Sequence, residues 1–279
     1  MKFSVFDPEW LGWRSTNSGA FTSAHDYREH LWSAERMQMR LRIFGTWAAP
    51  HYQDMSSMHD FRVLVQYSPD LPEPFWKELR ALADTYPVLR LVPTPHFEES
   101  SISVRHDLQA DGRSGPVVML RVDDDDIMSA DFLTQLDPHV IPEHHGWVVS
   151  LGYGLAARTD EEGLIDFRPW VTPLIAIGQA YIGRYDARSS ELDMSPLLHH
   201  RLVHRQLPTV LDSRSFAWVH VKHPWQDTRV GVDLEKARSA MLRGHHKLPT
   251  YDDDWTPVLQ AFPHLRPEIE RVQRQARLG

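Results

Sequence analysis

The amino-acid sequence predicts an α/β fold in which helices flank a mostly parallel central sheet. Strand patterns and helical patterns alternate over residues 60–150, and such alternation is typical of strands joined by helical crossovers. Residues 117–122 are apolar except for Arg121, as expected for a largely buried strand. With 42% hydrophobic residues among 279, the chain can bury a sizeable core.

The elements of the first half follow from the spacing of its apolar residues. Leu31, Met37 and Leu41 share one face of a helical pattern. A later run of β-branched and aromatic residues, closed by Ser-Pro-Asp, marks a strand that enters a turn. The expected elements are a short strand and loop up to about residue 22, a helix over 25–44, a strand over 61–67, a helix over 74–86 and strands over 89–93 and 117–122.

Capping residues and apolar runs indicate the elements of the second half. Ser195 and Thr256 each precede a proline, a combination expected at the start of a helix. No repeat or low-complexity segment interrupts the chain, so we expect one domain over residues 1–230 and a helical extension over 231–279 packed on it. The expected elements are a helix over 131–136, a strand over 146–155, extended chain over 168–178, a helix from Ser195, a strand over 216–221 and a helix from Thr256.

Composition and charge exclude several classes of protein. A net charge of −8 gives no basic surface for nucleic acid, and the absence of cysteine removes disulfides and cysteine nucleophiles. The sequence contains no dinucleotide, P-loop, zinc-protease or serine-hydrolase motif. Without a signal segment or a run of 18 apolar residues, the chain is expected to be cytoplasmic and to lack a transmembrane segment. Peripheral membrane contact through the basic C-terminal tail stays open.

Four consecutive aspartates follow the strand expected at 117–122, and we expect them to carry the chemistry of the chain. At the carboxyl end of a strand, their mutual repulsion would cost several kcal/mol unless a cation neutralises them. Hard divalent cations prefer carboxylate oxygens, and such a cation can bridge the phosphates of a nucleotide. The alternative is a turn that caps the following helix, which we favour for the second acidic cluster at 252–254. The four residues are Asp123, Asp124, Asp125 and Asp126.

Residues two apart on an extended segment face the same way, so Asp123 and Asp125 could share one metal or divide metal and ribose contacts. We expect Asp125 to be the principal metal ligand and Asp123 its partner. Asp124 is a further candidate for binding the nucleotide. Arg121, just before the run, could reach a diphosphate or form a structural salt bridge.

Three stretches of the chain resemble the bacterial rhamnosyltransferase family, a group of glycosyltransferases with the GT-A type of fold. These stretches are residues 40–44 with 61–65, residues 121–126 with Phe132, and residues 218–223. The resemblance implies a single GT-A type domain, Mn²⁺ or Mg²⁺, and a dTDP-, UDP- or GDP-sugar donor. It also implies transfer to a glycan or glycolipid acceptor. The chain departs from the family in its shortened first strand at residues 2–6.

Late histidines and a later carboxylate extend the candidate site. His223 is expected as a third metal ligand and His220 is a weaker candidate, although lone histidines more often lie on the surface or in the core. An inverting sugar transfer needs a carboxylate base, and Asp193 is the candidate, with Asp186 and Glu191 as others by position. Asp193 could equally be a helix cap. A histidine cluster could hold a second metal or an acceptor phosphate, or be scattered polar surface: His199, His200 and His204.

Two other functions stay open at this point. A metal-dependent phosphoester hydrolase would use the acidic run with two metals about 4 Å apart. A non-catalytic carbohydrate-binding protein would use some of the ten tryptophans, with the aspartates holding calcium.

Overall fold

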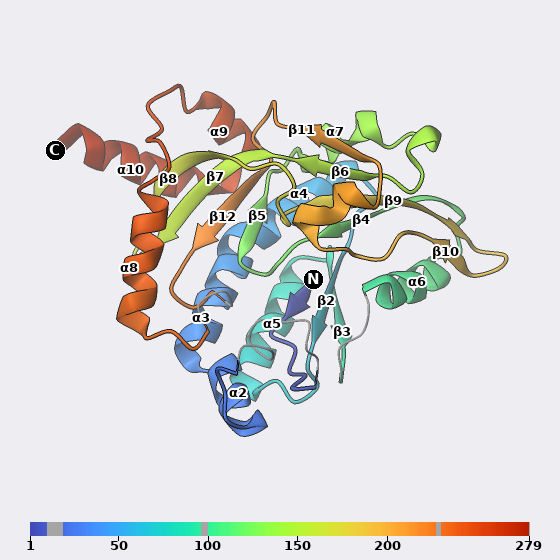
Figure 1. Cartoon of the computed structure of the whole chain (residues 1–279), viewed down its shortest axis with the longest axis horizontal. Helices are drawn as coiled ribbons and strands as arrows, with labels where there is room; N and C mark the ends of the chain where they lie inside the picture. Colours follow the sequence, from blue (N-terminus) through green and yellow to red (C-terminus); the bar gives the residue numbers. More distant parts are fainter. Residues whose placement is uncertain (10–18, 96–99, 227–229, 279) are drawn as a thin grey trace.

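The chain forms an α/β fold, and the computed structural model describes residues 1–9, 19–95, 100–226 and 230–278. Part of the predicted opening loop, residues 10–18, lies outside the described residues. Within the described residues the strands form three sheets, with helices packed around them (Figure 1). The predicted α/β class is therefore confirmed, whereas the GT-A type of fold stays a prediction.

The first sheet is parallel and follows the predicted alternation of strands and helices. Its strands lie in the order β1-β2-β3, and the helix α5 (Glu73–Thr85) connects β2 to β3. Gly45 permits this helix to approach closely, because a Cβ atom there would lie 2.7 Å from a methyl carbon of Leu82. The three strands are β1 (Lys2–Phe3), β2 (Val63–Tyr67) and β3 (Leu89–Pro93).

The other two sheets are mixed, so a mostly parallel sheet is not confirmed. In the second sheet β9 pairs antiparallel with β4, β6 and β10, whereas β6 and β11 are parallel. Residues 148–222, all of them described, contain no α-helix, so helical crossovers do not join their strands and hairpin neighbours run antiparallel. The strands are β4 (Gly115–Arg121), β6 (Val148–Leu151), β9 (Gln179–Asp186), β10 (Glu191–Asp193) and β11 (Thr209–Asp212).

The third sheet has the order β5-β12-β7-β8 and links the middle of the chain to its later part. The strand β12 lies antiparallel to β5 and parallel to β7, while β7 and β8 form an antiparallel hairpin. This arrangement places the segment after β4 beside a strand almost a hundred residues later. The strands are β5 (Asp126–Met128), β7 (Tyr153–Thr159), β8 (Leu164–Val171) and β12 (Trp218–Lys222).

The predicted helix over residues 25–44 is divided and then prolonged. Its pieces are α2 (Ala24–Leu31), α3 (Ala34–Arg42), the π-helix Ile43–Ala48 and α4 (Ala49–Met58). Trp32, in the break between α2 and α3, donates a hydrogen bond from Nε1 to the carbonyl of Ser4. The π-helix packs against β5, the strand that begins inside the acidic run.

Two further predictions need correction. The helix expected from Ser195 is absent; residues 195–199 lack helical structure and a 3₁₀-helix runs over His200–Arg205. The helix α6 (Ser100–Asp111) was not predicted, because its apolar residues share no clear face. The short helix α7 (Phe132–Leu136) lies where it was expected.

The described residues after 230 form helices joined by loops, and these helices pack on the third sheet and on α4 (Figure 1). Arg168 of β8 donates a hydrogen bond to the carbonyl of Leu248, and Trp47 donates one to Glu268. The division of the chain at residue 230 stays a prediction. The elements are α8 (Leu234–His245), α9 (Thr256–Ala261), the 3₁₀-helix Pro263–Leu265 and α10 (Arg266–Leu278).

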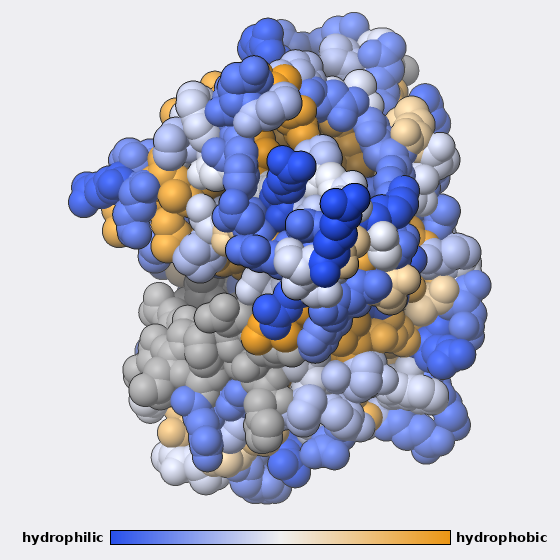
Figure 2. Space-filling view, turned by 90° about the vertical axis from the view of Figure 1, so that its right-hand side faces the viewer, coloured by the Kyte–Doolittle hydropathy of each residue, from blue (hydrophilic) through white to orange (hydrophobic). Residues whose placement is uncertain are grey.

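The surface carries scattered apolar side chains. On the face in Figure 2 the apolar side chains form separate patches among hydrophilic ones. Met58, Val171 and Leu211 are each more than half exposed and come from three different elements, as is usual for globular surfaces. In the described part of the chain, no helix is long and apolar enough to cross a membrane.

Acid should destabilise the contact between α4 and the C-terminal helices. His51 is fully buried against Phe262 and His264, and burial lowers its pKa from 6.5 to about 4. Since the unfolded chain binds this proton below pH 6.5 and the folded chain only near pH 4, stability falls as the pH drops through that window. The loss approaches about 3 kcal/mol for this group. Urea unfolding from pH 7 to pH 4 should show this slope, and His51→Phe should reduce it.

The control is His25→Asn, because the His25 side chain is 74% exposed. An equal slope in His51→Phe and in the native chain would contradict the assignment.

Candidate metal centre

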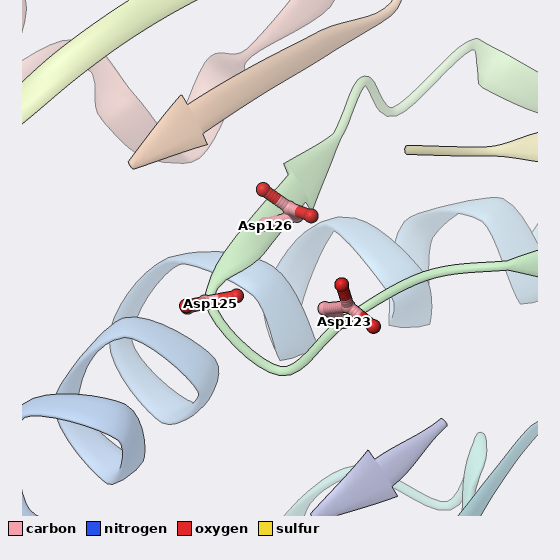
Figure 3. Close-up of side chains that lie close together, drawn as sticks. All are labelled: Asp123, Asp125 and Asp126. Atoms are coloured by element: carbon pink, nitrogen blue, oxygen red, sulfur yellow. The ribbon is translucent and has the colours of Figure 1, made fainter. Parts of the chain in front are cut away.

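The acidic run forms a tight loop between two sheets. Strand β4 ends at Arg121, and β5 begins at Asp126, whose backbone N–H lies 3.4 Å from the carbonyl oxygen of Asp123. Because β5 pairs antiparallel with β12, Asp126 lies opposite His220. The loop therefore lies beside β12, and Figure 3 shows helical segments behind it.

The four aspartates differ sharply in burial. Asp123 is exposed, whereas Asp124, Asp125 and Asp126 are 0%, 7% and 4% exposed. An ionised carboxylate in the protein interior needs a cation or hydrogen-bond donors, because removing it from water is costly. Each buried carboxylate of this loop has such a partner.

Arg40 of α3 neutralises the most buried carboxylate. Its Nη1 atom forms an ion pair with Asp124, and its Nη2 atom lies 3.7 Å from Oδ2 of Asp125. The Arg40 side chain is only 5% exposed. The Asp124 side chain is therefore paired with Arg40 in the interior and does not reach solvent.

His223 supports Asp125 from the end of β12. Its Nε2 atom lies 3.0 Å from Oδ2 of Asp125, and its side chain is fully buried. Burial lowers the pKa of His223, so the ring is neutral at pH 7 and donates its Nε2 proton to the carboxylate. Burial alone would raise the pKa of Asp125, but Arg40 and His223 hold it well below its ordinary range.

Asp126 belongs to a second hydrogen-bonded chain. His220 Nδ1 lies 2.8 Å from its Oδ1 atom, and Gln226 Nε2 lies 3.2 Å from the other ring nitrogen of His220. Burial raises the pKa of Asp126 to about 7, while the Asp126 carboxylate raises the pKa of His220 against the effect of burial. Asp126 and His220 thus share a proton, and they keep it at a higher pH than a free carboxyl group would. The Tyr52 hydroxyl donates to the backbone carbonyl of Asp126 at 3.3 Å.

The carboxylates of Asp123, Asp125 and Asp126 together have the spacing of a metal site. One oxygen from each lies within 4.8 Å of the others, and Figure 3 shows the three side chains around the bend of the loop. Oxygen atoms that share one cation at about 2.1 Å lie about 3–4 Å apart, so small side-chain rotations would close the triangle. The three residues therefore could hold a Mn²⁺ or Mg²⁺ ion.

This grouping partly follows the sequence prediction and partly differs from it. Asp123 and Asp125 lie together as expected. His223 is hydrogen-bonded to Asp125 but is not among the three residues whose ligand atoms lie close together. Asp126, ranked lower from the sequence, takes the place beside them. The sequence analysis missed Arg40, although an arginine on the same helix face as Met37 and Leu41 is a signal for a buried charge.

The structure places Arg121 at the edge of the loop but not inside it. Its backbone carbonyl accepts a hydrogen bond from Gly178, and its charge contributes to the low pKa of His200, which burial mainly lowers to about 4. The rings of His199 and His200 stack with centroids 5.0 Å apart. The charge of Arg121 thus acts on His200, and a role of His199, His200 or His204 in binding stays a prediction.

The structure does not bring Asp193 to the acidic loop. Asp193 pairs with Arg184, which pairs with Pro116 at the start of β4, whereas Arg121 at the end of β4 pairs with Gln179. Five residues of strand, about 17 Å, thus separate Asp193 from the loop. Its side chain is 71% exposed, and its Oδ2 atom lies 3.2 Å from Nε2 of His145. The other candidates, Asp186 and Glu191, pair with each other in the same hairpin.

Comparison with known proteins gives one family. The family model described as putative rhamnosyl transferase matches residues 10–251, a range that includes the acidic loop and all of β12. No curated protein matches the chain.

Asp124→Asn should destabilise the fold, because it leaves the buried charge of Arg40 without its closest partner. Removing one member of a buried ion pair typically costs about 3–5 kcal/mol, and the loss here should approach that range. Denaturant unfolding measures it.

The matched control is Asp123→Asn, one residue away and exposed. If the two variants unfold at the same denaturant concentration, Asp124 is not the buried anchor of this loop.

Proposed function

Because the chain belongs to the putative rhamnosyl transferase family, we propose that it is a metal-dependent glycosyltransferase. It transfers a sugar, with rhamnose the first candidate from the family name, from a nucleotide-diphosphate donor to a glycan or glycolipid. The observation that carries the proposal is the carboxylate triangle of Asp123, Asp125 and Asp126, which lies inside the matched range at the carboxyl end of a strand. The donor nucleotides to be tested are dTDP, UDP and GDP.

The triangle suits one divalent cation in contact with a diphosphate. The cation, when bound, would offset the negative charge that builds on the leaving diphosphate. Asp125 is kept ionised by Arg40 and His223 and is thus ready to bind a cation at neutral pH. Asp123 is exposed and can turn toward the metal or the ribose of the donor.

The remaining predicted residues take different positions in this proposal. Asp124 is buried against Arg40, so we assign it to holding the loop and not to contact with the nucleotide. His223 orients Asp125 from behind, since outer hydrogen-bond partners commonly fix the ligands of a metal. Asp193 is not carried forward as the base because its distance along β4 from the loop is too large.

The two other functions receive less support. A two-metal phosphoesterase would need ligands for a second cation, but Arg40 already occupies the inner side of the loop as a fixed cation. A carbohydrate-binding protein with structural calcium would bind no nucleotide. Nucleotide binding therefore distinguishes the glycosyltransferase from the two alternatives.

We expect dTDP, UDP or GDP to bind the chain only when Mn²⁺ or Mg²⁺ is present, as measured by calorimetry. Asp125→Asn should weaken this binding and donor hydrolysis by more than the roughly 10–100-fold typical for loss of an outer-shell partner. The reason is that it removes a direct metal ligand.

The control is Asp253→Asn in the second acidic cluster, where the residue is exposed in a turn. If no nucleotide binds, the glycosyltransferase proposal is wrong; if Asp125→Asn keeps full activity, the metal lies elsewhere.

A further inference from the structure

Arg40 is a buried cation that reaches two neighbouring carboxylates of the acidic loop. It comes from α3, 84 residues earlier in the chain than Asp124. One terminal nitrogen pairs with Asp124 and the other lies 3.7 Å from Oδ2 of Asp125. A guanidinium can contact two carboxylates at once because its donors are fixed in a planar fork, and it stays charged at every working pH.

We propose that Arg40 is the positioning residue of the metal loop. It takes up the charge of Asp124 and fixes one oxygen of Asp125, so that the loop presents its remaining carboxylates to a single divalent cation. This inference rests on the proposed function in assuming that the loop binds a metal, and it goes further by assigning the division of roles among the aspartates to one side chain of α3.

Two side chains approach the same oxygen of Asp125. Arg40 Nη2 and His223 Nε2 both approach Oδ2 of this carboxylate, at 3.7 Å and 3.0 Å. The hydrogen bond with His223 restricts rotation of the carboxylate, and the charge of Arg40 attracts the same oxygen without a hydrogen bond. Both interactions are made to Oδ2 and not to Oδ1. Oδ1 is therefore the atom that Asp125 offers to a cation shared with Asp123 and Asp126.

Charge supports the same assignment. Four consecutive carboxylates attract more than one divalent cation, and a second cation bound behind the loop would compete with the first. Arg40 occupies that inner side with a charge that belongs to the fold. The loop then needs one exchangeable cation, on the side where Asp123 is exposed.

The test must distinguish two roles of Arg40, the positioning of Asp125 and the neutralisation of Asp124. In the double variant Arg40→Met/Asp124→Asn both buried charges are removed together, so the fold should persist. Mn²⁺ affinity, measured by electron paramagnetic resonance on the folded full-length chain, should nevertheless fall about 10–100-fold, as expected when a ligand loses an outer partner. A purely structural Arg40–Asp124 pair would leave the affinity unchanged.

Arg40→Lys provides a second measurement that does not depend on the double variant. Lysine keeps the positive charge but lacks the fork, so it can satisfy Asp124 without holding Asp125, and Mn²⁺ affinity should again fall. The control is Arg62→Met/Asp107→Asn, which removes a partly buried ion pair of 3.0 Å outside the loop. This control should keep native Mn²⁺ affinity.

Each outcome has a distinct meaning. If the native chain binds no Mn²⁺, the proposed function fails together with the metal site. If the native chain binds Mn²⁺ and the folded double variant or Arg40→Lys binds it equally well, the metal site stands and the role of Arg40 is overturned. If the double variant does not fold, Arg40→Lys alone decides.

Discussion

Burial of three successive carboxylates at one bend of the chain is the constraint on which the site depends. Asp124, Asp125 and Asp126 leave solvent almost completely, although each would be more stable in water as an isolated anion. The fold compensates with partners from elsewhere: Arg40 below the loop, and His223 and His220 beside it. Removing the partner of a buried charge costs more than the pair itself contributes, so these contacts tie the loop firmly to its surroundings.

Helix packing and strand pairing bring these partners to the loop. The helix α3 supplies Arg40 to the loop, and the π-helix that follows packs against β5. The strand β12 pairs antiparallel with β5, and its register sets His220 opposite Asp126. Because the second and third sheets are mixed, strands separated by almost a hundred residues meet at the loop. The site is therefore assembled by sheet pairing and not by one continuous motif.

Because their partners differ, the four aspartates are chemically different from one another although they are identical residues. Asp124 becomes an internal anchor, Asp125 an ionised carboxylate hydrogen-bonded to His223 and close to Arg40, and Asp126 one member of a pair that shares a proton. Asp123 alone keeps its exposure. The chain belongs to the putative rhamnosyl transferase family, and under the proposed function a nucleotide-diphosphate donor would need a cation at such a position.

The sequence by itself determined the α/β class and the parallel strands of the first sheet, and it singled out the acidic run and the late histidines that the structure brings into contact. These follow from local patterns, because apolar periodicity and capping depend on neighbouring residues. Only the tertiary structure decided that Asp124 turns inward to Arg40, that β9 runs antiparallel to β4, and that Asp193 lies at the far end of β4. Strand direction and the choice of partner for a buried charge depend on residues far away in the chain, and no local spacing encodes them.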